Sequence, residues 1–244
     1  MNTVKIMGGI GNQLFQYAFA RAQVGDVGLD ISFYSSPDNH TEVIPSREFI
    51  LDKFNCHYKI VDNPFFADIV TEDKYDSKKV YQDTYFVGYW QKEEYFKNIE
   101  QELKRELTLK DEYITDEMKQ IASEMQSCNS VSIHVRRDDF VTLGHALDKD
   151  YYTDAIKVIR NEVKKPKFYV FSDDMEWCKK NFTSSFKFIH IGEYQDFYLM
   201  QQAKNNIISN STYSYWGYYL NTKKHILIAP NDWKGVPCLE RGKK

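Results

Sequence analysis

Residues 131 to 140 read Val-Ser-Ile-His-Val-Arg-Arg-Asp-Asp-Phe, an apolar stretch that ends in four charges. Valine, isoleucine and valine at 131, 133 and 135 alternate with serine and histidine, which predicts a short buried strand. Arg136 and Arg137 repel each other and need a compensating anion. Asp138 and Asp139 could supply it, and so could a phosphate, which guanidinium binds through paired hydrogen bonds. A salt-bridge cluster at the strand end is the alternative interpretation.

From residue 131 onward, predicted strands and helices alternate. The strands are expected at 131–135, 167–172, 187–191, 206–209 and 225–229, and the helices at 151–163, 174–181, 195–204 and 213–221. Such alternation predicts an α/β fold with a doubly wound parallel sheet.

Polar residues gather where three of these strands end. The charged group from His134 to Asp139 follows the first, Ser172-Asp173-Asp174 the second, and Ser209 to Thr212 the fourth. Ligands of doubly wound sheets bind outside the carboxyl ends of the strands. Each group alone could be a helix cap. Together with the double arginine, they favour an anionic ligand such as a nucleoside diphosphate.

The chain opens with a predicted strand at 3–7, a glycine-rich turn at Gly8–Gln13 and a helix at 14–22. This layout directs backbone N–H groups at an anion, although the glycines could instead make only a tight turn. Asn12 and Gln13 are amides that suit sugar hydroxyls. Because G-x-G-x-x-G spacing is absent, a nicotinamide-dependent oxidoreductase is disfavoured.

The middle of the chain is less regular. Strand candidates occur at 29–34, 49–54 and 85–89, and amphipathic helices are expected at 93–109 and 115–126. A boundary in the 110–128 region divides the chain into an N-terminal domain at 1–125 and a C-terminal domain at 126–244.

Composition is that of a soluble globular protein, with 42% apolar and 27% charged residues. A net charge of −3 gives no drive toward nucleic acid. The aromatic content of 16% suits stacking on sugars or a tyrosine-rich core. With no signal peptide and no long apolar segment, we expect a cytoplasmic protein without a transmembrane segment. The basic tail at 234–244 leaves peripheral membrane contact open as an alternative to a solvated end.

No metal site is expected from the sequence. The four cysteines are widely separated, which predicts free thiols, and the histidines lack ligand spacing. Asp148-Lys149-Asp150 has the D-x-D form of a metal motif, but it precedes a helix, where capping explains it. His134 is either a ligand-facing donor or a buried polar residue.

Four motifs resemble those of the α-1,2-fucosyltransferases, members of glycosyltransferase family 11. They are Gly8-Gly9-Ile10-Gly11-Asn12-Gln13-Leu14-Phe15-Gln16-Tyr17-Ala18, His134-Val135-Arg136-Arg137-Asp138-Asp139, Phe171-Ser172-Asp173-Asp174 and Asn210-Ser211-Thr212-Tyr213-Ser214-Tyr215-Trp216-Gly217. Gly88-Tyr89-Trp90-Gln91 is also similar, so the resemblance covers nearly the whole chain.

The resemblance implies a GT-B-like fold of two Rossmann-like domains, with the acceptor side N-terminal and the GDP-fucose site C-terminal. It implies inverting transfer from GDP-β-L-fucose to the 2-hydroxyl of a terminal galactose on a glycan, with no cofactor or essential metal. The catalytic residues would be Arg136, Asp139 and His134. Donor-binding residues would be Arg137, Ser172, Asp173, Asn210, Ser211, Thr212, Gly9, Gly11, Asn12 and Gln13.

The chain departs from the family pattern at Asp138, where the α-1,2 group usually has glycine, and in its shorter length. Both features leave a non-catalytic sugar-nucleotide binder as an alternative function. Transfer to another linkage, such as α-1,6, is the alternative within the enzyme interpretation.

Overall fold

The computed structural model describes residues 1–23, 26, 28–39, 46–62, 66, 68–223 and 225–230. The chain divides into two compact units, the first ending at Lys110 and the second beginning at Asp111. A boundary at 125/126 would place α3 (Asp116–Gln126) in the N-terminal domain. It belongs instead to the second unit, where it contacts α7 (Glu193–Met200).

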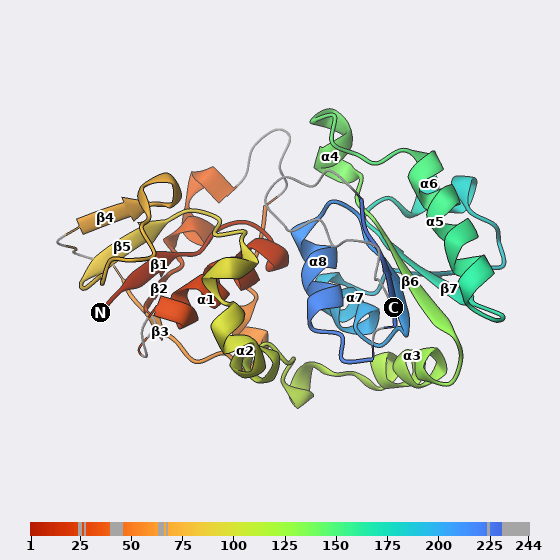
Figure 1. Cartoon of the computed structure of the whole chain (residues 1–244), viewed down its shortest axis with the longest axis horizontal. Coiled ribbons are helices and arrows are strands. Elements are labelled where there is room, and N and C mark those ends of the chain that lie inside the picture. The colour runs from red at the N-terminus through yellow and green to blue at the C-terminus, as the bar shows by residue number, and fades with distance from the viewer. Residues whose placement is uncertain are drawn as a thin grey trace. The chain divides into compact units, whose positions relative to one another are not determined.

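The first unit is built on a five-stranded parallel sheet in the order β3-β2-β1-β5-β4 (Figure 1). Its elements are β1 (Thr3–Lys5), α1 (Ile10–Gln23), β2 (Gly28–Asp30), β3 (Lys59–Ile60), β4 (Asp68–Thr71), β5 (Thr84–Val87) and α2 (Glu100–Glu106). Short 3-10 helices lie at Ser32–Ser35, Pro37–Asn39, Leu51–Lys53, Glu72–Lys74, Glu93–Tyr95 and Lys97–Ile99.

Three predictions for this unit are wrong in detail. The strand expected at 29–34 ends at Asp30, because residues 32–35 form a 3-10 helix. The helix expected at 93–109 is α-helical only in α2, because Phe96 and Ile99 leave helical geometry with φ values of −136° and −120°. Phe96 is fully buried against Phe15, so tertiary packing overrides the helical pattern there. The strand expected at 49–54 is a 3-10 turn, since the Gln13 side chain engages the backbone at its start.

The second unit contains the predicted doubly wound sheet, with five parallel strands in the order β10-β9-β6-β7-β8. Its further elements are β6 (Ser130–Val135), α4 (Asp138–Thr142), α5 (Lys149–Glu162), β7 (Lys167–Ser172), α6 (Met175–Asn181), β8 (Lys187–Ile189), β9 (Asn205–Ile207), α8 (Thr212–Tyr219) and β10 (Ile226–Ile228). A 3-10 helix at Asp111–Tyr113 precedes α3. Every strand and helix predicted after residue 130 is present, and among the residues described there the sequence missed only the short helix α4.

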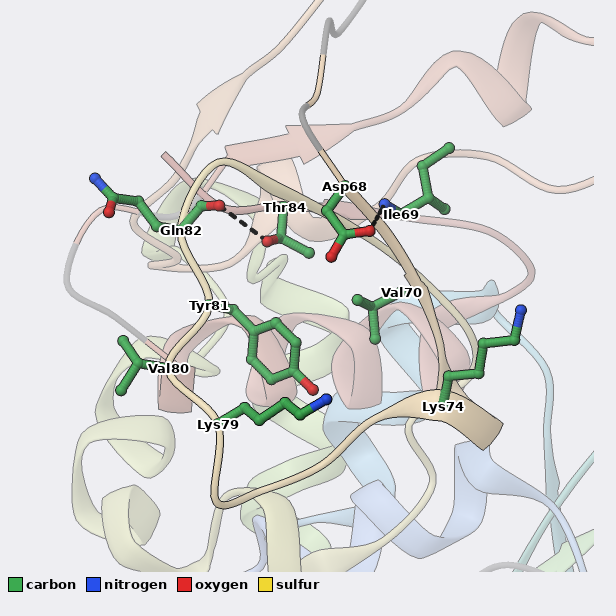
Figure 2. A pocket seen from close by; sticks show the side chains of 9 residues that line it. All are labelled: Asp68, Ile69, Val70, Lys74, Lys79, Val80, Tyr81, Gln82 and Thr84. Carbon is green, nitrogen blue, oxygen red and sulfur yellow. Dashed lines mark hydrogen bonds between the residues drawn. The ribbon is translucent and has the colours of Figure 1, made fainter.

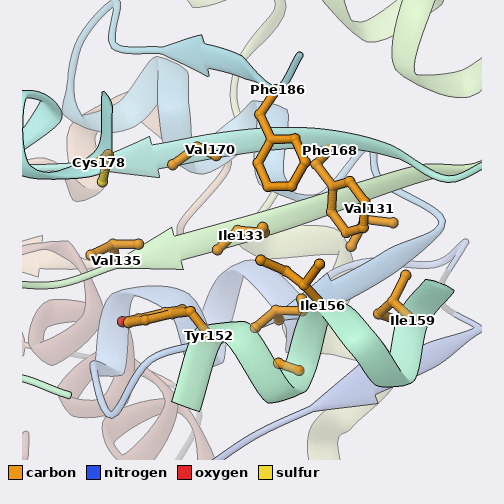
Figure 3. Close-up of a cluster of buried hydrophobic side chains, with 12 residues drawn as sticks. Val131, Ile133, Val135, Tyr152, Ile156, Ile159, Phe168, Val170, Cys178 and Phe186 are labelled. Atoms are coloured by element: carbon orange, nitrogen blue, oxygen red, sulfur yellow. The ribbon is translucent and has the colours of Figure 1, made fainter. Parts of the chain in front are cut away.

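The central strand β6 is buried on both faces. Val131, Ile133 and Val135 belong to an apolar core with side chains of α5 and β7, as Figure 3 shows. The intervening Ser132 and His134 are also buried, and each has a hydrogen-bond partner that follows or lies in β9. One face of β6 is therefore apolar and the other carries hydrogen-bonded polar side chains. Both faces are buried, as is usual for strands of parallel sheets.

Both sheets share one topological feature. In the second unit the chain proceeds from β6 through β7 to β8, then returns to place β9 on the other side of β6. In the first unit it proceeds from β1 through β2 to β3, then returns to place β5 on the other side of β1. Ligands of open α/β sheets bind at such switch points, outside the carboxyl ends of the strands. Each unit therefore has one expected ligand edge.

The described cysteines, Cys56, Cys128 and Cys178, are free thiols as predicted, and Cys238 and the basic tail lie outside the described residues. Within the described ranges, no helix is both long enough and apolar enough to traverse a lipid bilayer.

Candidate active site

The guanidinium of Arg136 is held between two carboxylates directly beyond the carboxyl ends of β6 and β7. Its Nη1 atom lies 2.8 Å from Oδ2 of Asp173, and Nη2 donates to Oδ1 of Asp139. The side chain is 17% exposed, so the group is partly desolvated but still accessible. A guanidinium has five N–H groups, and these contacts leave others for an anionic ligand.

Arg137 is fixed separately. Its Nε atom donates to Oδ2 of Asp174 at 3.1 Å, and its guanidinium lies 4.4 Å from the ring centroid of Trp177. The backbone N–H of Arg137 also donates to Oδ1 of Asp173 at 2.8 Å. The two arginines therefore repel each other less than the sequence suggests, because each has its own acidic partner. Both oxygens of Asp173 help to place them.

The strand β7 supplies this acidic support through a compact turn. The Ser172 hydroxyl accepts a hydrogen bond from the Asp174 backbone N–H at 3.0 Å. Asp174 caps α6, since its Oδ1 accepts from the Trp177 backbone N–H at 2.9 Å. Burial raises the pKa of Asp173 in spite of the nearby Arg136, and the charge of Asp138 adds to that increase.

Asp138, Asp139 and Asp173 form an acidic group whose oxygens come within 4.8 Å of one another. Three carboxylates this close could hold a divalent cation. Two of them already contact the Arg136 guanidinium, which places a positive charge among them. The single guanidinium balances one of the three carboxylate charges, so the acidic group keeps an excess of negative charge, to which the exposed Asp138 contributes without an ion pair among the described residues.

His134 lies inside the second unit. Its Nδ1 atom is 2.9 Å from Oγ of Ser209, and its ring centroid is 5.1 Å from that of Tyr213. Burial, with a smaller contribution from the charge of Arg136, lowers the pKa of His134 to about 3. Of the two interpretations of this residue, the buried polar position is confirmed. The imidazole is neutral near pH 7 and connects β6 to the turn that follows β9.

That turn leads into α8. Ser211 is the N-cap, with its hydroxyl accepting from the Tyr213 backbone N–H at 3.3 Å, and Thr212 begins the helix. Asn210 donates to the backbone carbonyl of His145 at 2.8 Å. Within the described residues, the buried Oδ1 atom of Asn210 has no hydrogen-bond partner. The predicted donor residues 210–212 thus lie at a helix N-terminus beside the switch point of the second unit.

The predicted glycine turn of the first unit is held by its own amides. Gln13 is fully buried, and its Nε2 atom donates to the backbone carbonyls of Gly8 and Glu48 at 3.0 and 2.8 Å. Its Oε1 atom accepts from the Ile50 backbone N–H at 2.9 Å. Gly8 has a φ of +80°, and a Cβ there would lie 2.6 Å from Nδ2 of Asn12. Gln13 therefore ties the turn to residues 48–50.

Asn12, Gly9 and Gly11 open the helix α1. The Gly9 carbonyl accepts from the backbone N–H groups of Asn12 and Gln13, and Gly11 is buried in the first turn. Oδ1 of Asn12 accepts from Nε2 of Gln91 at 2.9 Å. These residues lie in the first unit, whereas the arginine cluster lies in the second, so the structure places the predicted donor residues at two separate ligand edges.

The D-x-D sequence at 148–150 begins α5. Asp148 occupies the N-cap position with extended backbone geometry, but its side chain accepts no capping hydrogen bond. Asp148 therefore occupies the predicted N-cap position, but its side chain does not make the predicted capping hydrogen bond. Neither aspartate of the D-x-D sequence belongs to the acidic group at 138, 139 and 173, which is the one found among the described residues.

A hollow of about 500 Å³ in the first unit lies over β4 and β5 (Figure 2). It forms where residues 72–83 cross between two parallel strands without the α-helix that usually covers such a crossover. Its lining includes Val70, Lys74, Lys79 and Tyr81. None of the predicted site residues lines it, so it is distinct from both ligand edges.

Sequence reasoning did not anticipate the roles of Trp177 and Ser209. Trp177 supports Arg137 from three residues beyond Asp174, a spacing that brings side chains to one helix face, and this was the available signal. Ser209 was assigned to a polar strand end without its specific contact to His134. That contact joins strands that are not consecutive in sequence, so no local pattern reveals it.

The chain is similar in sequence to known proteins along almost its whole length. The model described as Glycosyl transferase family 11 matches residues 1–243. An alpha-1,2-colitosyltransferase from Escherichia coli is 32% identical over 276 residues, covering 94% of this chain and 91% of that protein. Galactoside 2-alpha-L-fucosyltransferase Sec1 from Mus musculus is 26% identical, covering 94% of this chain and 67% of that protein.

Comparison with solved structures shows the fold. The fucosyltransferase NodZ from Bradyrhizobium aligns with a TM-score of 0.54 at 11% identity, covering 88% of this chain and 91% of NodZ. POFUT1 in complex with GDP-fucose aligns with a TM-score of 0.54 at 12% identity, covering 93% of this chain and 97% of POFUT1. The GT-B-like α/β architecture expected from the sequence is thereby confirmed.

Proposed function

This chain belongs to glycosyl transferase family 11, and we propose that it transfers L-fucose from GDP-β-L-fucose to the 2-hydroxyl of a terminal galactose. The observation that carries this proposal is the placement of Arg136. Its guanidinium is preorganised by two carboxylates at the carboxyl edge of the second sheet, beside the α8 N-terminus. A partly buried guanidinium next to a helix N-terminus is suited to a diphosphate.

The reaction is a single displacement with inversion at C1 of fucose. The acceptor oxygen forms a bond to C1 while the bond from C1 to the diphosphate oxygen breaks, and the electron pair leaves with GDP. Arg136 stabilises the negative charge that develops on the diphosphate. Asp139 restrains the guanidinium, and His134 supports the adjoining turn as a neutral hydrogen-bonding group. The acceptor proton passes to a base or to water.

The remaining residues of the second unit have supporting roles. Arg137 supports the diphosphate site, and Asp173, with Ser172, positions both arginines and contacts the guanosine or ribose. Asn210, Ser211 and Thr212 contact the phosphates at the start of α8, where the helix dipole favours negative charge. The buried Oδ1 atom of Asn210, which lacks a partner among the described residues, is consistent with ligand contact.

In the N-terminal domain, the residues that contact the donor are Gly9, Gly11, Asn12 and Gln13. The buried contacts of Gln13 favour an indirect role for that residue, through the shape of the turn. The N-terminal domain receives the acceptor glycan, and the C-terminal domain binds GDP-fucose.

We propose that no metal ion is required, because two cationic side chains already lie where the diphosphate would bind. Asp138, Asp139 and Asp173 are the residues that would hold a divalent cation if one took part. EDTA in the assay distinguishes the two cases: activity that survives chelation supports the arginine mechanism, and activity that is lost and then restored by Mg²⁺ or Mn²⁺ assigns the charge to a metal.

A second donor deserves a direct comparison because a relative with 32% identity is an alpha-1,2-colitosyltransferase. Colitose is L-fucose without its 3-hydroxyl, so GDP-colitose would differ from GDP-fucose only in the sugar. Discrimination would then rest on whether a protein group hydrogen-bonds the 3-hydroxyl.

The test is GDP release from GDP-fucose and GDP-colitose with lactose, with N-acetyllactosamine and in buffer alone. Galactoside-dependent release from GDP-fucose, with a product fucosylated at the 2-hydroxyl, is expected. Preference for GDP-colitose would reassign the donor, and a product of another linkage would reassign the acceptor position. GDP binding without release on any galactoside would identify a non-catalytic binder.

A further inference from the structure

The switch point of the first sheet carries an aromatic side chain that the donor site does not use. Here the turn after β1 and the loop after β5 meet, and Gln91 donates to Asn12 across them at 2.9 Å. Gln16 adds a second connection, from its Nε2 atom to the Gly88 carbonyl at 3.2 Å. In this unit, amide side chains therefore connect the two loops at the edge where open α/β sheets bind ligands.

Tyr89 lies in this loop and is 46% exposed. Within the described residues, its ring has no aromatic contact and its hydroxyl has no hydrogen bond. Most other aromatic rings of this unit pack against one another, as Phe19, Tyr75 and Trp90 do. A large aromatic face left uncovered at a ligand edge points to a function in binding.

The backbone holds Tyr89 in this position at some cost. Trp90 has a φ of +55°, an uncommon value for a bulky residue, and its ring is fully buried against Phe19 at a centroid distance of 3.8 Å. Oε2 of Glu72 accepts from the backbone N–H groups of both Tyr89 and Trp90, at 3.1 and 2.9 Å. Backbone strain of this kind concentrates at ligand sites.

Gly88 makes this arrangement possible. A Cβ atom at position 88 would lie 2.8 Å from Cβ of Glu72 and 3.1 Å from the Trp90 ring, so a larger residue would displace the carboxylate. The buried Trp90 and the Glu72 carboxylate thus fix the backbone of Tyr89 while its side chain remains exposed.

The charges at this edge distinguish between ligands. Gly8–Gln13 and Gly88–Gln91 contain no lysine or arginine, and Lys92, the next residue, holds its ammonium 5.6 Å from the Tyr95 ring centroid and 4.0 Å from Glu94. The loops therefore present no arginine cluster of the kind that faces a diphosphate in the second unit. They offer amides and an aromatic face, which together suit a neutral sugar. Galactose has an axial 4-hydroxyl, which leaves a continuous patch of C–H groups on one face of its ring, and that patch can pack on an aromatic ring.

We propose that Tyr89 is the platform on which the acceptor sugar packs its apolar face, and that it favours a β-galactoside over the 4-epimeric glucoside. This proposal rests on the proposed fucosyltransfer and specifies its acceptor subsite. Tyr89 acts through contact with the sugar ring, so its hydroxyl is dispensable and its aromatic face is not.

The test compares Tyr89→Ala and Tyr89→Phe with the control Val80→Ala, a change at a residue that is 96% exposed in the same unit. Loss of one aromatic contact should raise the acceptor KM about five- to tenfold and reduce the preference for galactoside over glucoside. Tyr89→Phe and Val80→Ala should retain the wild-type acceptor KM. The Kd for GDP, measured by calorimetry, should be the same in all four proteins.

An unchanged acceptor KM in Tyr89→Ala overturns the proposal, and so does a parallel rise in the Kd for GDP. Saturation-transfer NMR with methyl β-galactoside and methyl β-glucoside tests the platform without turnover. A galactoside signal that is lost in Tyr89→Ala supports it even if no fucose is transferred, in which case only the proposed reaction fails. Absence of a Tyr89-dependent signal for either sugar overturns it.

Discussion

The two ligand edges of this protein share a topology and differ in chemistry. Each has a hydrogen bond between two side chains across its switch point, His134 with Ser209 in the second unit and Gln91 with Asn12 in the first, at 2.9 Å in both. Beyond the contact, the second edge presents arginines paired with carboxylates. The first presents amides and an exposed tyrosine. The same parallel sheet can therefore prepare a site for an anion or for a neutral sugar.

The two edges differ in how their polar side chains are stabilised when no ligand is bound. A guanidinium without a ligand needs a counter-ion, and Asp139 and Asp173 provide one while leaving N–H groups available. Neutral amides need only hydrogen-bond partners, and Gln13 finds all of them in the backbone. We therefore expect changes at the second edge to affect chemistry first, and changes at the first edge to affect stability or acceptor binding.

The largest effect is expected for Arg136→Ala. Removing the cation that faces the leaving diphosphate should lower kcat by about a thousandfold and weaken GDP binding, because oriented charge is worth most in a partly desolvated site. Steady-state kinetics and calorimetry measure both. Arg160→Ala, on the exposed side of α5, is the matched control. An Arg136→Ala enzyme with near-normal kcat would contradict the assignment of Arg136.

Gln13→Leu should act through stability. The change leaves the Glu48 carbonyl and the Ile50 N–H without their partner, whereas the Gly8 carbonyl keeps the Tyr34 hydroxyl as a donor. The free energy of unfolding should therefore fall by about 2 kcal/mol. Urea denaturation gives this value, and Gln126→Leu, at an exposed glutamine, should have little effect. A rise in the donor KM with no loss of stability would instead show that Gln13 contacts the donor.

His134 should make the protein less stable in acid. Its pKa in the folded state, about 3, lies below the ordinary value near 6.5, so below pH 6.5 the unfolded chain takes up a proton that the folded chain does not. Acidification should therefore cost up to about 1.4 kcal/mol per pH unit between pH 6.5 and 4.5. The slope should be shallower in His134→Asn and unchanged in His225→Asn, an exposed control. Equal slopes in all three proteins would contradict the buried neutral imidazole.

The smallest effect is expected at Asp138. Replacing its exposed carboxylate by the neutral amide in Asp138→Asn should tighten GDP binding about three- to fivefold at low salt, because like charge near the diphosphate is removed. The gain should shrink at high ionic strength. Asp154→Asn, at an exposed position of α5, is the control. Weaker GDP binding in Asp138→Asn would mean that the carboxylate assists binding, as a metal ligand would.

The second unit was largely predictable from its sequence because its order is local. Most strands of 131–230 are short segments marked by apolar residues, and each polar group lies at or directly after a strand end. The first unit was harder. Its strands β3 and β4 are short with exposed residues, so periodicity does not reveal them. The contacts of Gln13 with residues 48–50 join positions that are more than 30 residues apart in sequence, so no local sequence pattern predicts them.

The sequence by itself determined that residues 131–230 form a doubly wound sheet and that Arg136, Asp173 and Ser211 meet at one edge, because parallel strands bring their carboxyl ends together. Only the tertiary structure decided how those charges are paired, and that His134 is buried and neutral, because both depend on neighbours supplied by other strands. The tertiary structure also decided that Tyr89 stays exposed, since the Glu72 carboxylate and the stacked Trp90 fix its backbone from distant positions in the chain.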